Sequence, residues 1–97
     1  ERVPAFPDIP TSAEQGLQDF TFTAWIGLYG PPGLPREIVT RANTALNQAL
    51  ADPATRARMT DRGDEPGGGT PDQLAEITRA DHARWGGVVR NANIRAE

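Results

Sequence analysis

The spacing of apolar residues divides the chain into an arm, an alternating segment and a helical region. Residues 1–10 contain three prolines, and since proline lacks an N–H and favours an extended preceding residue, this part is predicted to be an arm. From 19 to 30 apolar residues recur at every second position, which is the period of a strand. One face of this predicted strand carries Phe20, Phe22, Ala24, Ile26 and Leu28. Trp25 and Tyr29 make the other face partly apolar, so we expect both faces to be covered.

Helical spacing replaces the alternation after the turn at Gly30–Gly33. Pro35 suits the first position of a helix, and an amphipathic helix is predicted from there to Asp52. Asp52 and Pro53 then form an N-cap and a first helical residue, which predicts a second helix up to Arg62 with a stop at Gly63. Residues 64–69 are predicted to be a loop or a short edge strand.

Two capping patterns predict further helix starts. Thr11 and Glu14 fit a capping box, in which each side chain accepts a hydrogen bond from the other residue's backbone N–H. With Gly16 close behind, this pattern allows a single turn at most. Residues 70–73 repeat the pattern before a long final helix, whose stripe contains Leu74, Ile77, Asp81, Trp85 and Val88 or Val89. Asn91 and Asn93 are its predicted terminators, because Asn tolerates the left-handed conformation.

Composition and charge exclude several classes of protein. The 97 residues include ten Arg, no Lys and thirteen acidic residues, for a net charge of −3. This balance excludes an overall basic nucleic-acid binder. No apolar run has the roughly 18 residues of a membrane span. With no Cys and a single His, thiolate metal sites, disulfides and His clusters are excluded, and we expect no cofactor.

The supply of core residues is small. Leu, Ile, Val and Phe together make 18 of the 97 residues, which is near the level where independent folding becomes difficult. One strand also cannot form a sheet alone. We therefore expect the chain to be a piece of a larger fold.

Three local patterns are candidate sites. Asp81 and His82 pair a carboxylate with an imidazole, but adjacent helical residues point about 100° apart, so we expect no catalysis and no enzyme. Residues 67–69 are three glycines before a helix, but they lack the Lys of a phosphate-binding loop, which favours a plain turn. Trp25 and Gly27 fit either the wall of a ligand cleft or ordinary core packing.

Longer stretches of the chain resemble a known family. Residues 6–16 (FPDIPTSAEQG) and 23–39 (TAWIGLYGPPGLPREIV) carry most of the resemblance, with support from 43–53, 63–66, 70–71 and 84–85. These stretches are similar, in the same order, to the tripartite tricarboxylate transporter receptor family, the Bug-type periplasmic solute-binding proteins. The resemblance covers essentially the whole chain.

The resemblance implies an α/β fold, namely the C-terminal part of a type II periplasmic-binding-protein-like fold with one long crossing strand. Residues 1–18 would end one lobe and approach the hinge, and 19–97 would supply the crossing strand and C-terminal helices of the other lobe. It also implies a periplasmic receptor that in full-length form captures a small carboxylate for membrane permease subunits. Thr23, Trp25 and Gly27 are the candidate ligand-binding residues.

A different class of function also fits the pattern. A strand with apolar faces and free backbone groups is a template for another chain. The chain is therefore alternatively interpreted as a stand-alone helical interaction module that pairs through this strand. Under either interpretation we expect the strand to promote self-association.

Overall fold

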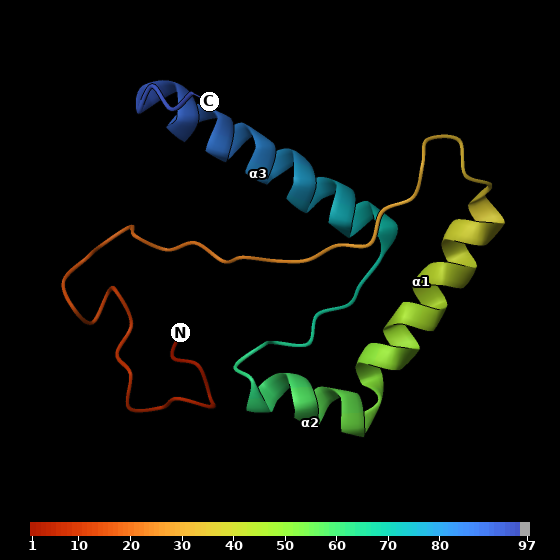
Figure 1. Ribbon diagram of the computed structural model, residues 1–97, viewed down its shortest axis with the longest axis horizontal. Coiled ribbons are helices and arrows are strands. Elements are labelled where there is room, and N and C mark those ends of the chain that lie inside the picture. Colours follow the sequence, from red (N-terminus) through yellow and green to blue (C-terminus); the bar gives the residue numbers. More distant parts are fainter. Residues whose placement is uncertain (96–97) are drawn as a thin grey trace.

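Three helices and two long non-helical segments make up the molecule. A computed structural model of the chain describes residues 1–95, with helices α1 (Arg36–Ala51), α2 (Pro53–Asp61) and α3 (Pro71–Asn91). α1 and α2 meet at an angle, and α3 begins beside α1 and runs away from it (Figure 1). The radius of gyration is 17.0 Å, whereas a compact chain of this length has about 12.5 Å. The arrangement is therefore open.

Local signals set the boundary between α1 and α2. Pro35 is the N-cap of α1, so the predicted start at Pro35 is one residue early. Asp52 separates the two helices with an extended backbone, and its side chain accepts a hydrogen bond from the Thr55 N–H at 2.9 Å. Pro53 is the first residue of α2, where its missing N–H costs nothing. The predicted break at Asp52 is confirmed.

Each of the last two helices ends with a left-handed residue. Gly63 has φ +84°, and the N–H of Asp64 donates to the carbonyl of Met59 at 2.9 Å. At the end of α3, Asn93 has φ 51°, and Ile94 donates to Val89 at 3.0 Å. Both arrangements satisfy the free carbonyls of a last helical turn. The sequence prediction placed both stops correctly.

The predicted capping boxes are also confirmed. Thr70 and Gln73 exchange side-chain to backbone hydrogen bonds of 2.8 and 3.2 Å at the start of α3. Thr11 and Glu14 do the same at 2.7 and 3.2 Å within the N-terminal arm, where they close a turn. Arg2 pairs with Glu14 at 2.9 Å and so folds the arm back on itself.

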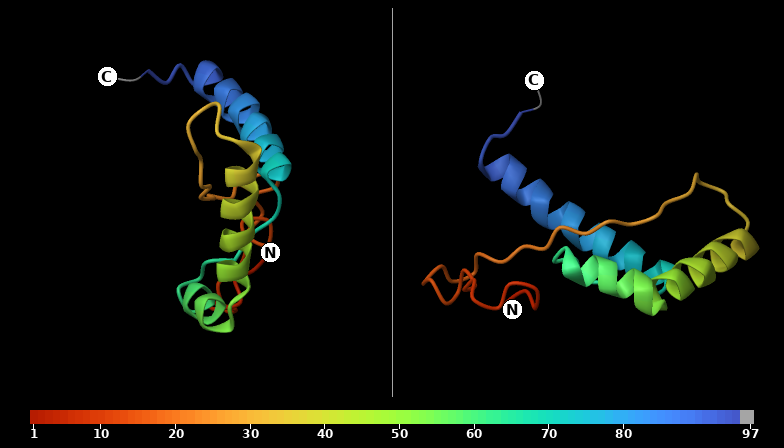
Figure 2. Two further views of the ribbon diagram at one scale, coloured as in Figure 1. Left: turned by 90° about the vertical axis from the view of Figure 1, so that its right-hand side faces the viewer. Right: turned by 60° about the horizontal axis from the view of Figure 1, so that its bottom comes forward.

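An asparagine pair fixes the start of α3 against α1. Asn47 donates to the Gly69 carbonyl at 2.8 Å and accepts from the Gly69 N–H at 2.9 Å. Asn43 donates to the same carbonyl at 2.9 Å. The end of the loop 64–69 is thereby held against α1, and α3 begins beside this helix (Figure 2).

The prediction of an α/β fold with a long crossing strand is wrong. The helices are the only regular elements within residues 1–95, and neither 19–30 nor 64–69 forms a strand. Residues 20–30 are extended and run beside α3 (Figures 1 and 2). Their N–H and C=O groups find no backbone partner among the described residues, and a strand exists only where a neighbouring backbone pairs with it.

Coverage of the extended segment is one-sided, which also differs from expectation. Trp25 and Tyr29 bond to α3, while Ile26 is fully exposed and Leu28 is 67% exposed. No residue between 1 and 95 is fully buried. The prediction that both faces are covered is therefore wrong for the described chain. The lack of fully buried residues between 1 and 95 agrees with the small number of large apolar residues in the sequence.

Candidate ligand site

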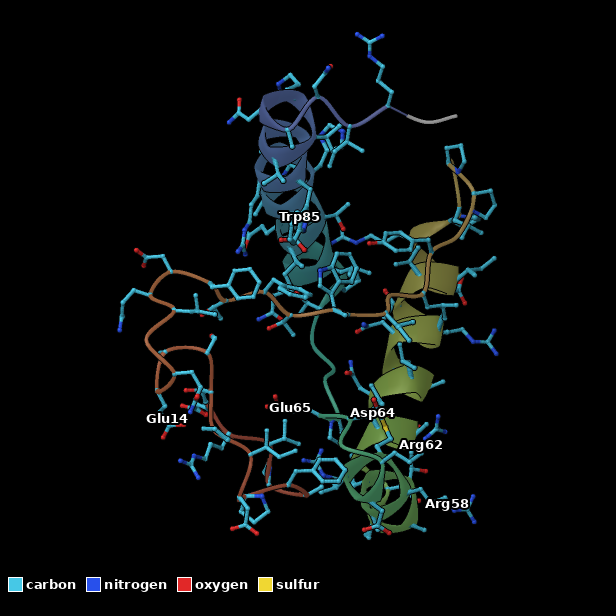
Figure 3. All side chains as sticks on the ribbon, turned by 60° about the vertical axis from the view of Figure 1, so that its left-hand side comes forward. Glu14, Arg58, Arg62, Asp64, Glu65 and Trp85 are labelled. Carbon is cyan, nitrogen blue, oxygen red and sulfur yellow. The ribbon has the colours of Figure 1, made fainter. Side chains whose placement is uncertain are left out.

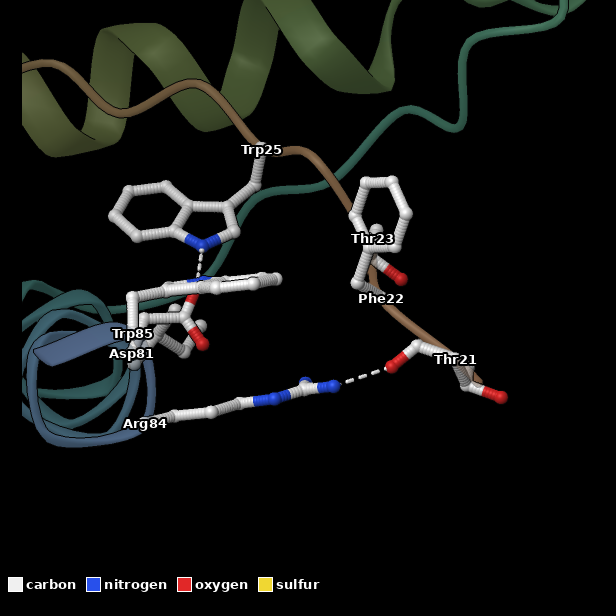
Figure 4. Close-up of a pocket in the computed structure, with 8 residues that line it drawn as sticks. Thr21, Phe22, Thr23, Trp25, Asp81, Arg84 and Trp85 are labelled. Carbon is white, nitrogen blue, oxygen red and sulfur yellow. Dashed lines mark hydrogen bonds between the residues drawn. The ribbon is translucent and has the colours of Figure 1, made fainter. Parts of the chain in front are cut away.

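A shallow pocket lies where the extended segment passes α3. Its volume is about 180 Å³. The segment contributes hydroxyl and aromatic groups, and α3 contributes a carboxylate, a guanidinium and an indole (Figure 4). The lining residues are Thr21, Phe22, Thr23, Trp25, Ile77, Asp81, Arg84 and Trp85.

The indole of Trp25, which is hydrogen-bonded to α3, forms the first wall of the pocket. The indole Nε1 donates to Oδ2 of Asp81 at 2.6 Å (Figure 4). An ionised acceptor makes this a comparatively strong hydrogen bond, which orients the indole across the pocket. Trp25 is 38% exposed, so part of its ring remains available to a ligand.

Arg84 and Trp85 form the second wall. The Arg84 guanidinium lies 5.2 Å from the centre of the Trp85 ring, within the range of a cation–π contact. Its Nη2 donates to the carbonyl of Thr21. The edge of Phe22 meets Trp85 at 6.0 Å between ring centroids and 84° between planes. Because one of five N–H groups is used, Arg84 keeps donors for an anion.

Gly27 lies outside this pocket. A Cβ on Gly27 would approach Cδ1 of Leu74 to 3.0 Å, so the glycine permits close approach of the segment to the start of α3. The next contact follows at Tyr29, whose hydroxyl lies 2.6 Å from Oγ1 of Thr78. Thr23 and Trp25 thus line one pocket, whereas Gly27 packs one step further along α3.

Sequence reasoning missed the α3 half of the pocket. Asp81, Arg84 and Trp85 stand at positions i, i+3 and i+4, which share one helix face. The stripe predicted for the final helix contains Asp81 and Trp85 but not Arg84, and Asp81 is interpreted as a candidate site only beside His82. In the structure the Asp81 carboxylate accepts a hydrogen bond from the Trp25 indole.

The candidate pattern of glycines at 67–69 also has a structural partner. The Gly69 N–H, which would have to face an anion, donates to Asn47. Arg58 and Arg62 lie near the end of α2 together with Asp64 and Glu65 (Figure 3). Arg62 lies 4.0 Å from Asp64, and both side chains are largely exposed. These features are those of a turn and of a solvated mixed-charge surface.

Comparison with known proteins shows to which family the chain belongs. The model of the tripartite tricarboxylate transporter family receptor matches residues 1–94. The chain belongs to this family. Membership confirms the resemblance noted in the sequence and favours a receptor over a stand-alone interaction module. None of the helices among the described residues is both long and apolar enough to cross a membrane.

Relatives of this receptor-family chain occur in several bacteria. A protein in the tcbD-tcbE intergenic region of Pseudomonas sp. (strain P51) is 33% identical over 97 residues, covering 99% of this chain and 29% of the relative. Protein BugT of Bordetella pertussis is 32% identical over 95 residues, covering 98% and 29%. The chain thus spans less than a third of the length of these relatives. No solved structure matches it at a significant level.

Proposed function

We propose that the chain is part of a periplasmic solute receptor that captures a small carboxylate and presents it to the permease subunits of a tripartite transporter. The family match over residues 1–94 carries this proposal. We further propose that residues 1–18 belong to one lobe and its hinge, and that 19–97 belong to the other lobe. The function is binding without a chemical step.

The pocket chemistry supports an anionic ligand at Arg84. A guanidinium matches the two oxygens of a carboxylate with parallel N–H donors. The hydroxyl of Thr23 lines the same pocket, and the two indoles give it apolar walls. Asp81 lies on the same side of α3 as Arg84 and is bonded to Trp25. The ligand carboxylate is therefore assigned to the Arg84 end, away from the Asp81 charge.

Since the chain spans 29% of the Pseudomonas and Bordetella relatives, its pocket would supply one wall of a two-lobed site. A pocket that is open on one side leaves the ligand largely hydrated, and the lost contacts lower the affinity. We expect the 97-residue chain to bind succinate or citrate with a Kd of about 1 mM or weaker.

The test is an NMR titration of the 97-residue chain with succinate and citrate, with sodium chloride at matched ionic strength as the blank. The chain has two Trp, so two indole N–H signals report on the two pocket walls. We expect both signals to shift, and we expect Arg84→Gln to abolish the shifts. Arg58→Gln, an exposed position on α2, should leave them unchanged.

Two results would contradict the proposal. Indole signals that stay fixed at saturating carboxylate would remove the pocket from the ligand site. Micromolar affinity of the isolated chain would show that residues 1–97 hold a complete site, against the proposed division between two lobes.

A further inference from the structure

Two opposite charges line the pocket from one face of α3 without pairing with each other. Asp81 and Arg84 stand three residues apart, a spacing at which a carboxylate and a guanidinium on a helix can form an ion pair. The ion pairs within residues 1–95 involve Arg2 and Arg62 instead. The pocket therefore presents one negative and one positive group to a molecule that enters it.

Contacts with the extended segment hold the two charged groups. Oδ2 of Asp81 accepts a hydrogen bond from the Trp25 indole at 2.6 Å, and Nη2 of Arg84 donates to the Thr21 carbonyl. Figure 4 shows the Asp81 carboxylate between the Trp25 ring and the Arg84 side chain. Oδ1 of Asp81 accepts no hydrogen bond from any group among the described residues. Asp81 therefore keeps an acceptor in the pocket, as Arg84 keeps donors.

We propose that Asp81 determines the specificity of the candidate site by selecting a ligand with an ammonium group on the carbon next to its carboxylate. The ligand is then an amino acid, with its carboxylate on Arg84 and its ammonium group on Oδ1 of Asp81. This inference rests on the proposed receptor function, and it narrows the small carboxylate of that proposal to a zwitterion.

The charges of the pocket favour a zwitterion over a plain dicarboxylate. A zwitterion meets an opposite charge at both of its ends, whereas the second carboxylate of a dicarboxylate comes near the like charge of Asp81. A hydroxyl group on the same carbon can donate to Asp81, but it lacks the charge that strengthens the hydrogen bond. Both charges belong to residues of this chain, so the preference is expected with or without the rest of a receptor.

NMR titrations of the 97-residue chain with propionate, L-lactate and L-alanine at equal ionic strength test the preference. The three ligands share a carboxylate and a methyl group, and they differ in carrying hydrogen, hydroxyl or ammonium on the carbon between. The two indole N–H signals report binding. We expect the Kd of alanine to be about threefold or more below that of propionate, which is the effect of a partly exposed charge pair. Lactate should fall between the two.

Asp81→Asn isolates the effect of the charge. The amide of this variant retains an oxygen that can accept from Trp25, but the negative charge is lost. We expect propionate then to bind at least as tightly as alanine, because the ammonium group would lie near the Arg84 guanidinium with no carboxylate beside it. Glu76→Gln is the matched control, since Glu76 is exposed on α3 outside the pocket and the net charge changes equally. It should keep the order of the three ligands.

The possible results distinguish this inference from the receptor function. Equal affinities for propionate and alanine, with signals that do shift, overturn the selection of an ammonium group and leave the carboxylate pocket in place. Lactate that binds as tightly as alanine also overturns it, as does a preference for alanine that survives Asp81→Asn. Indole signals that stay fixed with every carboxylate, succinate and citrate included, overturn the receptor site and this inference with it.

Discussion

At the scale of single residues, Glu14 links the fold of the arm to pH. The Arg2 guanidinium, followed by the Thr11 N–H, holds the pKa of the Glu14 carboxyl below its ordinary value of 4.5. A pKa lowered by folding adds stability above the unfolded value, and this stability is lost as pH falls through the folded value. The turn at 11–16 should therefore loosen as the solution is acidified below about pH 4.5.

The backbone amide signals of Thr11 and Glu14 measure this transition by NMR. Glu14→Gln can keep the bond to the Thr11 N–H but loses the ion pair with Arg2, so the acid transition of these signals should disappear. Glu37→Gln, at an exposed acidic position in α1, should leave the transition in place. An arm whose amide signals are unchanged by acid would contradict the role of Glu14.

The residues that line the pocket show which part of the candidate site can be predicted from the sequence. Period-two spacing placed Thr23 and Trp25 on one face, and both line the pocket. Their partners Asp81, Arg84 and Trp85 lie more than fifty residues away in the chain. Helical spacing puts these three on one face of α3, but no local signal says which face of the extended segment meets it. That choice depends on packing between distant parts of the chain.

At the scale of elements, Asn47 should be the main link between α1 and α3. Its amide makes two opposed hydrogen bonds with the backbone of Gly69, and a hydrogen bond contributes about 0.5–1.5 kcal/mol. Asn47→Ala should lower the free energy of unfolding by about 1–3 kcal/mol, as measured by urea denaturation followed by circular dichroism. Gln48→Ala, at the adjacent exposed position, should have little effect. Equal losses for the two variants would exclude a specific role of the Asn47 amide.

The elements differ in how far local sequence determines them. Helix starts at Asp52 and Thr70 and the stop at Gly63 depend on groups within a few residues, and each prediction was confirmed within about one residue. The strand predicted at 19–30 depends on a neighbour from outside the segment. Residues 20–30 have the extended backbone that the pattern predicted, but Phe22, from the face predicted opposite to Trp25, packs with it toward Trp85. No partner backbone pairs with the segment within residues 1–95.

At the scale of the whole molecule, the small core is accompanied by an open shape and a large exposed surface. The few large apolar residues predicted a thin core, and none of the residues between 1 and 95 is fully buried. A fully unfolded chain of this mass exposes about 15,200 Å² and a compact one about 5,400 Å². With 8596 Å² exposed, the folded chain lies clearly between the two.

This intermediate surface predicts a low sensitivity to denaturant. The urea m-value is proportional to the surface that becomes exposed on unfolding. Unfolding this chain would newly expose about two-thirds of the surface that unfolding a compact protein of the same mass would expose. The m-value of this chain should be about two-thirds of that of a compact domain of the same mass. An m-value equal to the compact one would mean that the chain closes further in solution, and the exposed face of residues 20–30 would then be covered within a single copy.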